Sequence, residues 1–426
     1  MNKRKFISSF LTLALIANIG NFTLMCTATP NLDESSSINS TAALTKENFL
    51  SLPKEKLAED FDYYWNTMKE NSPLFNLTKR HNEKLEEQYQ EYREKILQTD
   101  SNYEQLKLID EFSRKFYGHN GILLNYISYL KNLYGSMPSR KQWSDMLTDP
   151  LTERNTDMYN DFKWEQWRLQ KQALNTQNDA IREENVTTKI IEEKNIAYLK
   201  VRSFGVENIE KDGPIIAKFL DEVKDYNHLI IDITGNGGGS TDYMMNFANI
   251  LKNAHTVTDY YLFKIGENSK NYINHAFSED ILPIDKLPEF KHLNSNDKKE
   301  MTHFYKNSLT FIPYPDKSKI FKGKVWILVD EAVFSASETF AKVCKDTKEA
   351  TLVGRNTSGD GVGIDPAYII LPNSKVALRY TLEYGLNSDG SCNAEFGTKP
   401  DITSQDCETP LETCLKAIKE STQSIQ

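Results

Sequence analysis

Hydrophobic and polar positions follow two successive patterns along the chain. In the first pattern, apolar residues recur every three or four positions, which is typical of helices with one buried face. This spacing predicts a first helix that ends at Pro73 and further helices over residues 82–97 and 103–116, with residues 123–185 also mostly helical. The apolar positions of the first helix are Leu57, Phe61, Tyr64 and Met68. We therefore expect an N-terminal, mainly helical domain over residues 49–185.

The second pattern consists of short apolar runs that alternate with amphipathic segments. The predicted strands cover residues 190–201, 228–233, 325–329 and 350–353. The predicted helices cover residues 214–223 and 242–251, and a third ends at Lys345. Strands that alternate with helices are typical of an α/β sheet with right-handed crossovers, and almost wholly apolar strands fit the interior of a parallel sheet. We expect this α/β domain to span residues 186–420.

Composition adds two limits to this picture. The 426 residues include 39% hydrophobic and 26% charged residues, as in an ordinary soluble globular protein, and the chain is long enough for more than one structural unit. The formal net charge is −9 and no run of lysine or arginine stands out. A nucleic-acid-binding protein would show a basic patch, so we expect no nucleic-acid partner.

The first residues have the pattern of an export signal. Three basic residues at 3–5 precede an uncharged stretch over 6–25, and small residues follow up to Ala28. This pattern predicts a signal peptide over residues 1–28 with cleavage after Ala28, and hence a secreted or cell-surface protein. A polar, flexible tether is expected over residues 29–48. An uncleaved membrane anchor and a lipid attached at Cys26 are the alternatives, and no other membrane contact is expected.

Four cysteines follow the predicted signal peptide. An even number in an exported protein permits two disulfides, and free buried thiols are an equally open alternative. Their spacing does not match a zinc site, so we expect neither a metal nor an organic cofactor. These cysteines are Cys344, Cys392, Cys407 and Cys414.

Two segments carry candidate chemistry. A predicted helix opens at Ser335 and Ser337, directly after the buried strand 325–329. A serine at such a turn is held beside free backbone N–H groups, which suits an acyl-transfer nucleophile, although a simple helix N-cap is the alternative. Four glycines within residues 235–239 follow another buried strand, and glycines allow backbone N–H groups to approach an oxyanion.

Four motifs in order resemble a known family. They are Ile-Asp-Ile-Thr-Gly-Asn-Gly-Gly-Gly (231–239), Ser-Ala-Ser-Glu (335–338), Leu-Val-Gly-Arg-Asn-Thr-Ser-Gly (352–359) and Gly-Thr-Lys-Pro-Asp-Ile (397–402). Together they resemble the C-terminal processing peptidase and tricorn-core family of serine peptidases, over roughly residues 190–405. The resemblance implies a crotonase-like α/β core with Ser335 as nucleophile. It also implies an oxyanion hole formed by the N–H of Ala336 and that of Gly238 or Gly239.

The chain departs from this family at the base. The lysine that the processing peptidases use falls at Asp360, and residues 120–190 contain no carboxylate-binding loop, so no PDZ module is evident. The segment around His119 resembles instead the histidine motif of a Ser-His-Glu branch of the same clan. By that resemblance, His119 is the base and Glu395 orients its ring. Lys200 remains an alternative base, and Asp360 either serves as one or shapes the pocket.

These observations lead to two functional hypotheses. The first is a secreted serine endopeptidase that cleaves peptide or protein substrates through an acyl-enzyme on Ser335. The alternative is a non-catalytic peptide- or lipid-binding protein on the same scaffold, because the lysine base and the PDZ module are missing. Reaction of the serine with an active-site-directed reagent would distinguish the two.

Overall fold

A computed structural model describes residues 45–46, 48–174, 184–250, 252–277, 280–312 and 316–423. The predicted signal peptide, residues 1–28, and most of the predicted tether lie outside these residues. Of the helices in the described part, none is both long and apolar enough to cross a bilayer.

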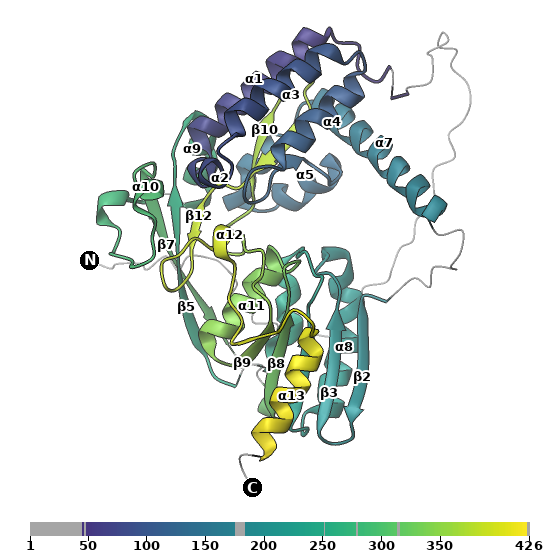
Figure 1. The fold of residues 1–426 in the computed structure, drawn as a ribbon, viewed down its shortest axis with the longest axis vertical. Coiled ribbons are helices and arrows are strands. Elements are labelled where there is room, and N and C mark those ends of the chain that lie inside the picture. Colours follow the sequence, from purple (N-terminus) through teal and green to yellow (C-terminus); the bar gives the residue numbers. More distant parts are fainter. Residues whose placement is uncertain are drawn as a thin grey trace. The chain divides into compact units, whose positions relative to one another are not determined.

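A six-stranded sheet forms the centre of the C-terminal half, with strand order β13-β9-β8-β4-β3-β2 (Figure 1). Neighbouring strands are parallel except β2, which pairs antiparallel with β3. Strong apolar runs form the inner strands because both faces of the sheet are covered. The strands are β2 (Val186–Glu192), β3 (Ile196–Val201), β4 (His228–Asp232), β8 (Lys324–Val329), β9 (Ala350–Gly354) and β13 (Ile402–Thr403).

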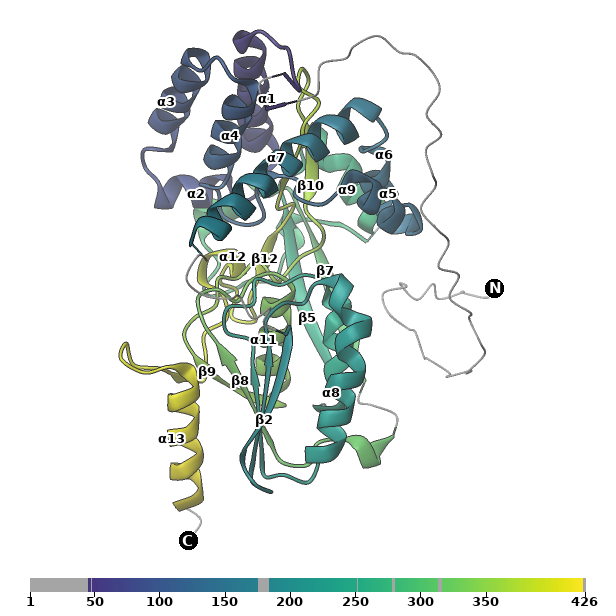
Figure 2. The ribbon, with the colours of Figure 1, turned by 90° about the vertical axis from the view of Figure 1, so that its right-hand side faces the viewer.

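Side chains alternate between the two faces of this sheet. On β4, Leu229 and Ile231 join one core with helices α8 (Ile209–Val223) and α11 (Ala336–Thr347). Ile230, between them, joins a second core with helix α13 (Pro410–Gln423) on the other face. Figure 2 shows α8 and α13 on opposite sides of the strands. Because alternate side chains enter a core on each face, the three consecutive residues Leu229, Ile230 and Ile231 are all apolar.

One predicted strand is in fact a hairpin. The alternation over residues 190–201 predicted a single strand, but a turn at residues 193–195 separates β2 from β3. The polar residues from Glu192 to Asn195 interrupt the apolar pattern, and Lys194 takes a positive φ of 58° in the turn. This prediction was wrong because residues on both sides of the turn have the same alternation.

The N-terminal region is mainly helical, as expected, and packs against strands from the C-terminal region. Its helices share one apolar core with the hairpin β10–β11, and β1 pairs antiparallel with β11. The mixed α/β architecture with a helical N-terminal region is thus confirmed. The elements are α1 (Lys54–Asn71), α2 (Phe75–His81), α3 (Leu85–Gln98), α4 (Asn102–Ser113), β1 (Gly121–Ile122), α5 (Ile127–Gly135), α6 (Lys141–Asp145), α7 (Pro150–Leu174), β10 (Ala367–Ile370) and β11 (Ala377–Tyr380).

A buried carboxylate joins the first helix to this hairpin. Asp60 of α1 accepts hydrogen bonds from the backbone N–H groups of Asn373 and Ser374, each at 2.8 Å. Burial raises the pKa of Asp60, while these hydrogen bonds act in the opposite direction. The boundary expected near residue 185 stays a prediction, since residues 175–183 lie outside the described part of the chain.

The remaining elements connect these parts. A second sheet has the order β12-β5-β7-β6 and is antiparallel throughout. Residues Thr241–Ile250, expected to be α-helical, form a 3₁₀ helix. The other elements are β5 (His255–Phe263), α9 (Glu267–Phe277), β6 (Leu282–Pro283), α10 (Ser295–Lys298), β7 (His303–Phe311), β12 (Tyr384–Leu386), α12 (Asn393–Phe396) and short 3₁₀ turns at Pro138–Arg140, Val206–Asn208, Ile284–Lys286 and Lys317–Lys319.

Candidate active site

Ser335 lies in the turn between β8 and α11, at the carboxyl end of the parallel strands. Its backbone has φ 61° and ψ −126°, a strained conformation for a residue with a side chain. Its N–H donates to the carbonyl of Gly359 at 3.1 Å, and its side chain makes no capping hydrogen bond to the helix. The residue is half-buried rather than enclosed in the core. Its hydroxyl is therefore not used as an N-cap and can be approached from solvent.

Ser337, the second serine of the motif, has a structural role. It is fully buried, and its hydroxyl lies 2.6 Å from the carbonyl oxygen of Asn236 and 2.9 Å from that of Phe334. It also accepts a hydrogen bond from the Phe334 N–H at 3.2 Å. These contacts bind the start of α11 to the glycine loop, and they leave Ser335 as the candidate nucleophile.

The glycine loop packs directly against Ser335. A methyl group on Gly238 would lie 2.6 Å from the Phe334 carbonyl oxygen and 2.8 Å from Ser335 Cβ, so only glycine fits there. The Gly238 N–H donates to the side-chain oxygen of Asn236 at 2.9 Å and is already occupied. The Gly238 carbonyl accepts from the Phe204 N–H at 3.0 Å.

This arrangement leaves two free amides beside the serine. Because a peptide group is planar and trans, the Gly239 N–H points opposite to the Gly238 carbonyl and thus away from Phe204. In the described part of the chain, neither the Gly239 N–H nor the Ala336 N–H has a hydrogen-bond acceptor. Of the expected oxyanion-hole donors, Ala336 and Gly239 fit the role, whereas the Gly238 amide is engaged.

His119 reaches the site from the loop between α4 and β1. Its ring nitrogen Nδ1 contacts Oδ2 of Asp360 in a short hydrogen bond, and its ring centroid lies 4.6 Å from that of Phe334. The His119 N–H donates to Thr381 Oγ1 at 2.7 Å, and this hydroxyl donates to Asp360 Oδ2 at 2.9 Å. Thr381 thus fixes both partners of the imidazole–carboxylate pair.

Neighbouring residues bring this pair to Ser335. Phe334, which contacts the His119 ring, precedes Ser335, and Gly359, which binds the Ser335 N–H, precedes Asp360. Asp360 itself has φ 54°, so this loop is also held in a conformation that few residues adopt. Serine, histidine and aspartate are therefore gathered from three separate segments.

The family comparison agrees with the resemblance expected from the motifs. Residues 195–404 match the model of peptidase family S41. This part of the chain belongs to peptidase family S41. Two solved structures have the same overall fold. One is that of a candidate peptidase from Parabacteroides merdae ATCC 43184, at 17% identity and a TM-score of 0.50, with 85% of this chain and 96% of that chain covered.

The other is mature CPAF complexed with lactacystin, at 11% identity and a TM-score of 0.51, with 88% of this chain and 98% of that chain covered. At such low identity these structures show the shared fold alone. No curated protein matches the sequence. The S41 match and the S41 fold support a peptidase, and His119 lies outside the matched segment.

Glu395, the expected orienting carboxylate, contacts other residues. Its two oxygens accept from the guanidinium of Arg80 at 2.6 and 3.0 Å, and Oε1 lies 2.7 Å from His81 Nε2. Burial acts to raise the pKa of Glu395, but these hydrogen bonds hold it below its usual value. In the described residues the contact with the His119 ring comes from Asp360 instead, 241 residues away in sequence.

Lys200, the alternative base, is also engaged elsewhere. Its ammonium group donates to the hydroxyl and carbonyl of Thr234 at 2.8 and 3.0 Å and lies 3.2 Å from Asp232 Oδ1. The side chain stabilises the end of β4 and the entry to the glycine loop. This arrangement favours a structural role over proton transfer.

Glu338 was not among the predicted site residues, yet its buried side chain joins segments that flank the site. It is fully buried on the first turn of α11, and its Oε1 accepts from Asn393 Nδ2 at 2.6 Å and Thr398 Oγ1 at 2.7 Å. Burial raises the pKa of Glu338 to about 7. Asn393 in turn accepts from the N–H of Gly361 at 2.8 Å, next to Asp360. No local sequence pattern indicates these contacts, which join distant segments.

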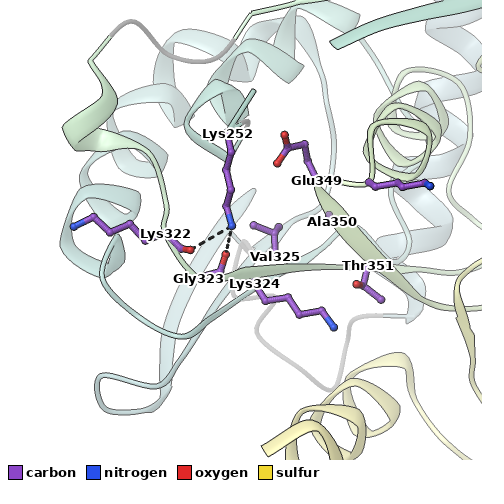
Figure 3. A pocket seen from close by; sticks show the side chains of 9 residues that line it. Lys252, Lys322, Gly323, Lys324, Val325, Glu349, Ala350 and Thr351 are labelled. Atoms are coloured by element: carbon purple, nitrogen blue, oxygen red, sulfur yellow. Dashed lines mark hydrogen bonds between the residues drawn. The ribbon is translucent and has the colours of Figure 1, made fainter. Parts of the chain in front are cut away.

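Two cavities differ in their relation to the site. One, of about 230 Å³, lies beside the imidazole and is lined by Arg114, Gly118, His119, Asn120, Phe334 and Arg379. The other, of about 350 Å³, is lined by residues at the start of β8 and β9 (Figure 3). Ser335 follows the opposite end of β8. There Lys252 donates to the backbone carbonyls of Lys322 and Gly323 at 3.2 and 2.8 Å. Only the smaller cavity adjoins the candidate catalytic residues.

Within the described residues, no group of three or more histidine, cysteine or acidic side chains could hold a metal ion. The four cysteines in this part of the chain are free, so neither disulfide that their even number permitted is formed in the structure.

Proposed function

We propose that this chain is a serine endopeptidase in which Ser335 is the nucleophile, His119 the general base and Asp360 the orienting carboxylate. The observation that carries the proposal is the contact between His119 and Asp360 beside a half-buried serine in a strained turn. The carboxylate would fix the tautomer of the ring with the proton on Nδ1 and stabilise the imidazolium that forms. It replaces Glu395 in the scheme expected from the motifs.

The reaction follows from this arrangement. Because Nδ1 is bound to Asp360, Nε2 is the nitrogen left to take the proton of Ser335 as its Oγ attacks a peptide carbonyl. The N–H groups of Ala336 and Gly239 would stabilise the negative charge on the carbonyl oxygen. The imidazolium then protonates the leaving amine, and water releases the acyl group by the reverse proton transfers. This chemistry requires no metal or organic cofactor.

The proposed substrates are peptides or proteins, as the S41 match supports. The basic, apolar and small-residue pattern of residues 1–28 supports an exported enzyme. Cleavage after Ala28 and lipid attachment at Cys26 are alternative ways in which the signal peptide of an exported enzyme could be processed.

Labelling with a fluorophosphonate tests the nucleophile directly. The reagent should modify Ser335, and Ser335→Ala should lose the label and lower kcat for casein cleavage by about 10⁴-fold to 10⁶-fold. Ser308→Ala, an exposed serine on β7, is the control and should keep both properties. Cleavage at the unaltered rate by purified Ser335→Ala would eliminate the proposal. A chain that neither cleaves nor reacts would favour the non-catalytic binding protein.

A further inference from the structure

We propose that the cavity beside His119 binds a carboxylate group of the peptide substrate through Arg379 and Arg114. The inference rests on the proposed peptidase function and specifies which substrates this site prefers. The carboxylate is either an acidic side chain or the C-terminal carboxylate of the peptide, and the experiment below distinguishes them.

Arg379 is a half-buried cation that forms no ion pair with the described residues. It lies on β11 between Gly121 and Tyr368 in the register of the small sheet. Its Nε is buried and makes no hydrogen bond, and no described carboxylate forms an ion pair with the guanidinium. Burial lowers the pKa of Arg379 and the charge of Arg114 acts in the same direction, whereas Tyr368, Tyr134 and Asp360 act to raise it. The nearby Asp360 is paired with His119 rather than with Arg379, so an anion that enters the cavity would be stabilised beside this guanidinium.

Arg114 places a second positive charge at the same point. A methyl group on Gly121 would lie 2.9 Å from Asp110 Oδ1 and 3.3 Å from Arg114 Nη2, so this ion pair covers the glycine that pairs with Arg379. Arg114 binds Asp110 at 3.1 Å, but Asp110 also binds Lys163 at 2.7 Å. One carboxylate thus contacts two cations, so Asp110 cannot neutralise both Arg114 and Lys163.

The donors and acceptors of the cavity fit an acidic peptide residue. Guanidinium groups present paired N–H donors that match the two oxygens of a carboxylate. The side-chain N–H₂ of Asn120 donates to the carbonyls of Tyr117 and Phe116, at 2.8 and 3.3 Å. The buried side-chain oxygen of Asn120 accepts no hydrogen bond from the described residues. That oxygen can accept a backbone N–H of the bound peptide. The cavity, of about 230 Å³, has room for one such side chain or chain end.

The test compares matched peptides on the full-length enzyme. One series replaces glutamate by glutamine at successive positions around the cleaved bond, and the other replaces a free C-terminus by an amide. We expect kcat/KM to favour the carboxylate by about tenfold to a hundredfold at one position of one series. The first series reports an acidic side chain, and the second reports the chain end. Equal rates for every pair would overturn the proposal.

Variants assign the preference to the arginines. Arg379→Gln should reduce it to within about twofold, and Arg379→Lys, which keeps the charge but loses the paired donors, should give an intermediate value. Arg114→Gln should also weaken it. Arg93→Gln is the matched control, because Arg93 pairs with Asp62 on the surface of the helical region and should keep the full preference. An unreduced preference in both Arg379→Lys and Arg114→Gln would contradict the assignment, even if Arg379→Gln does not fold.

Calorimetric binding to the Ser335→Ala variant separates the two proposals. If the enzyme is inactive but this variant binds the carboxylate peptide at least tenfold more tightly than its neutral counterpart, the cavity proposal stands and the peptidase proposal fails. If the enzyme cleaves peptides but shows no such difference in rate or binding, the cavity proposal fails and the peptidase proposal stands.

Discussion

At the scale of single residues, two residues of the proposed active site have strained backbone conformations. Ser335 and Asp360 both have positive φ, although neither is glycine. Such conformations cost about 1–3 kcal/mol each and persist only where surrounding contacts enforce them. Here the hydrogen bond from the Ser335 N–H to Gly359 joins the two strained loops. The contacts that enforce these conformations hold the serine and the carboxylate in place before a substrate arrives.

The pairing of His119 with Asp360 leads to a residue-level prediction. Asp360→Asn keeps the shape of the side chain but removes the charge that stabilises the imidazolium and selects its tautomer. We expect kcat to fall by about 10⁴-fold, as the loss of the corresponding carboxylate does in serine proteases. Steady-state kinetics on a peptide substrate measures this change.

Glu395→Gln is the control that distinguishes the two candidate carboxylates. Because Glu395 binds Arg80 and His81, its neutralisation should weaken those contacts and change kcat by less than about tenfold. If Glu395→Gln abolishes catalysis and Asp360→Asn does not, the assignment of the triad made here is wrong and the one expected from the motifs is right.

At this scale, local motifs single out candidate residues but do not predict which residues contact them. Ser335 and His119 stand in local motifs, and the structure brings both segments to one site. Asp360 was considered only as a base or a pocket residue, because its contact with His119 spans 241 positions and no local pattern encodes such a contact. The spacing between Ser335 and Glu395 favoured a carboxylate that the fold places elsewhere.

At the scale of elements, the turn after β8 and the glycine loop after β4 form one unit. Apolar runs followed by serine or glycine predicted both elements from the sequence, since buried strands and flexible turns have strong local signals. The split of residues 190–201 into β2 and β3 was missed because the same alternation continues on both sides of the turn. The contacts that join the two loops, such as Ser337 with Asn236, arise only from folding.

This unit gives a prediction for the glycine loop. Gly238→Ala would force a methyl group against the Phe334 carbonyl oxygen and Ser335 Cβ, in a backbone with φ 96°. We expect kcat/KM to fall by at least about 10²-fold, because misplacing the nucleophile or the oxyanion donors by about 1 Å costs that much. The measurement is peptide cleavage at 25 °C, with far-ultraviolet circular dichroism to confirm folding.

Gly237→Ala is the matched control for this change. Gly237 is exposed, and a methyl group there would meet nothing within 4 Å. The variant should retain activity within about threefold. Equal effects of the two substitutions would show that loop flexibility, rather than close packing against Ser335, explains the glycines.

At the scale of the whole molecule, the site depends on an apolar core formed by segments that are far apart in the sequence. Helices of the N-terminal region share their apolar core with β10 and β11, and Asp60 binds the loop of that hairpin. The loop with His119 lies directly before β1, which pairs with β11. The sequence predicted the helical and α/β regions as separate patterns, but the pairing of residues more than 250 positions apart has no local signal. The architecture was therefore predictable, whereas the route by which His119 reaches Ser335 was not.

The same long-range packing makes the stability of the molecule depend on pH through Glu338. This residue of α11 contacts Asn393 at the start of α12 and Thr398 just after α12, and burial raises its pKa to about 7 from the value near 4.5 of a free glutamate. Between these two values the folded protein binds a proton that the unfolded chain does not. The free energy of unfolding therefore falls as pH rises from 4.5 to 7, by about 3 kcal/mol in total from this group.

Glu338→Gln should remove this dependence, because the amide oxygen can still accept from Asn393 and Thr398 and no charge forms as pH rises. Urea denaturation at pH 5 and pH 8 should show a smaller loss of stability in the variant than in the unaltered protein, by up to about 3 kcal/mol. Glu331→Gln, at an exposed position near the same turn, should leave the difference between the two pH values unchanged. If the unaltered protein and Glu338→Gln lose equal stability, Glu338 is ionised in the folded state at both pH values, and water must reach the base of the active site.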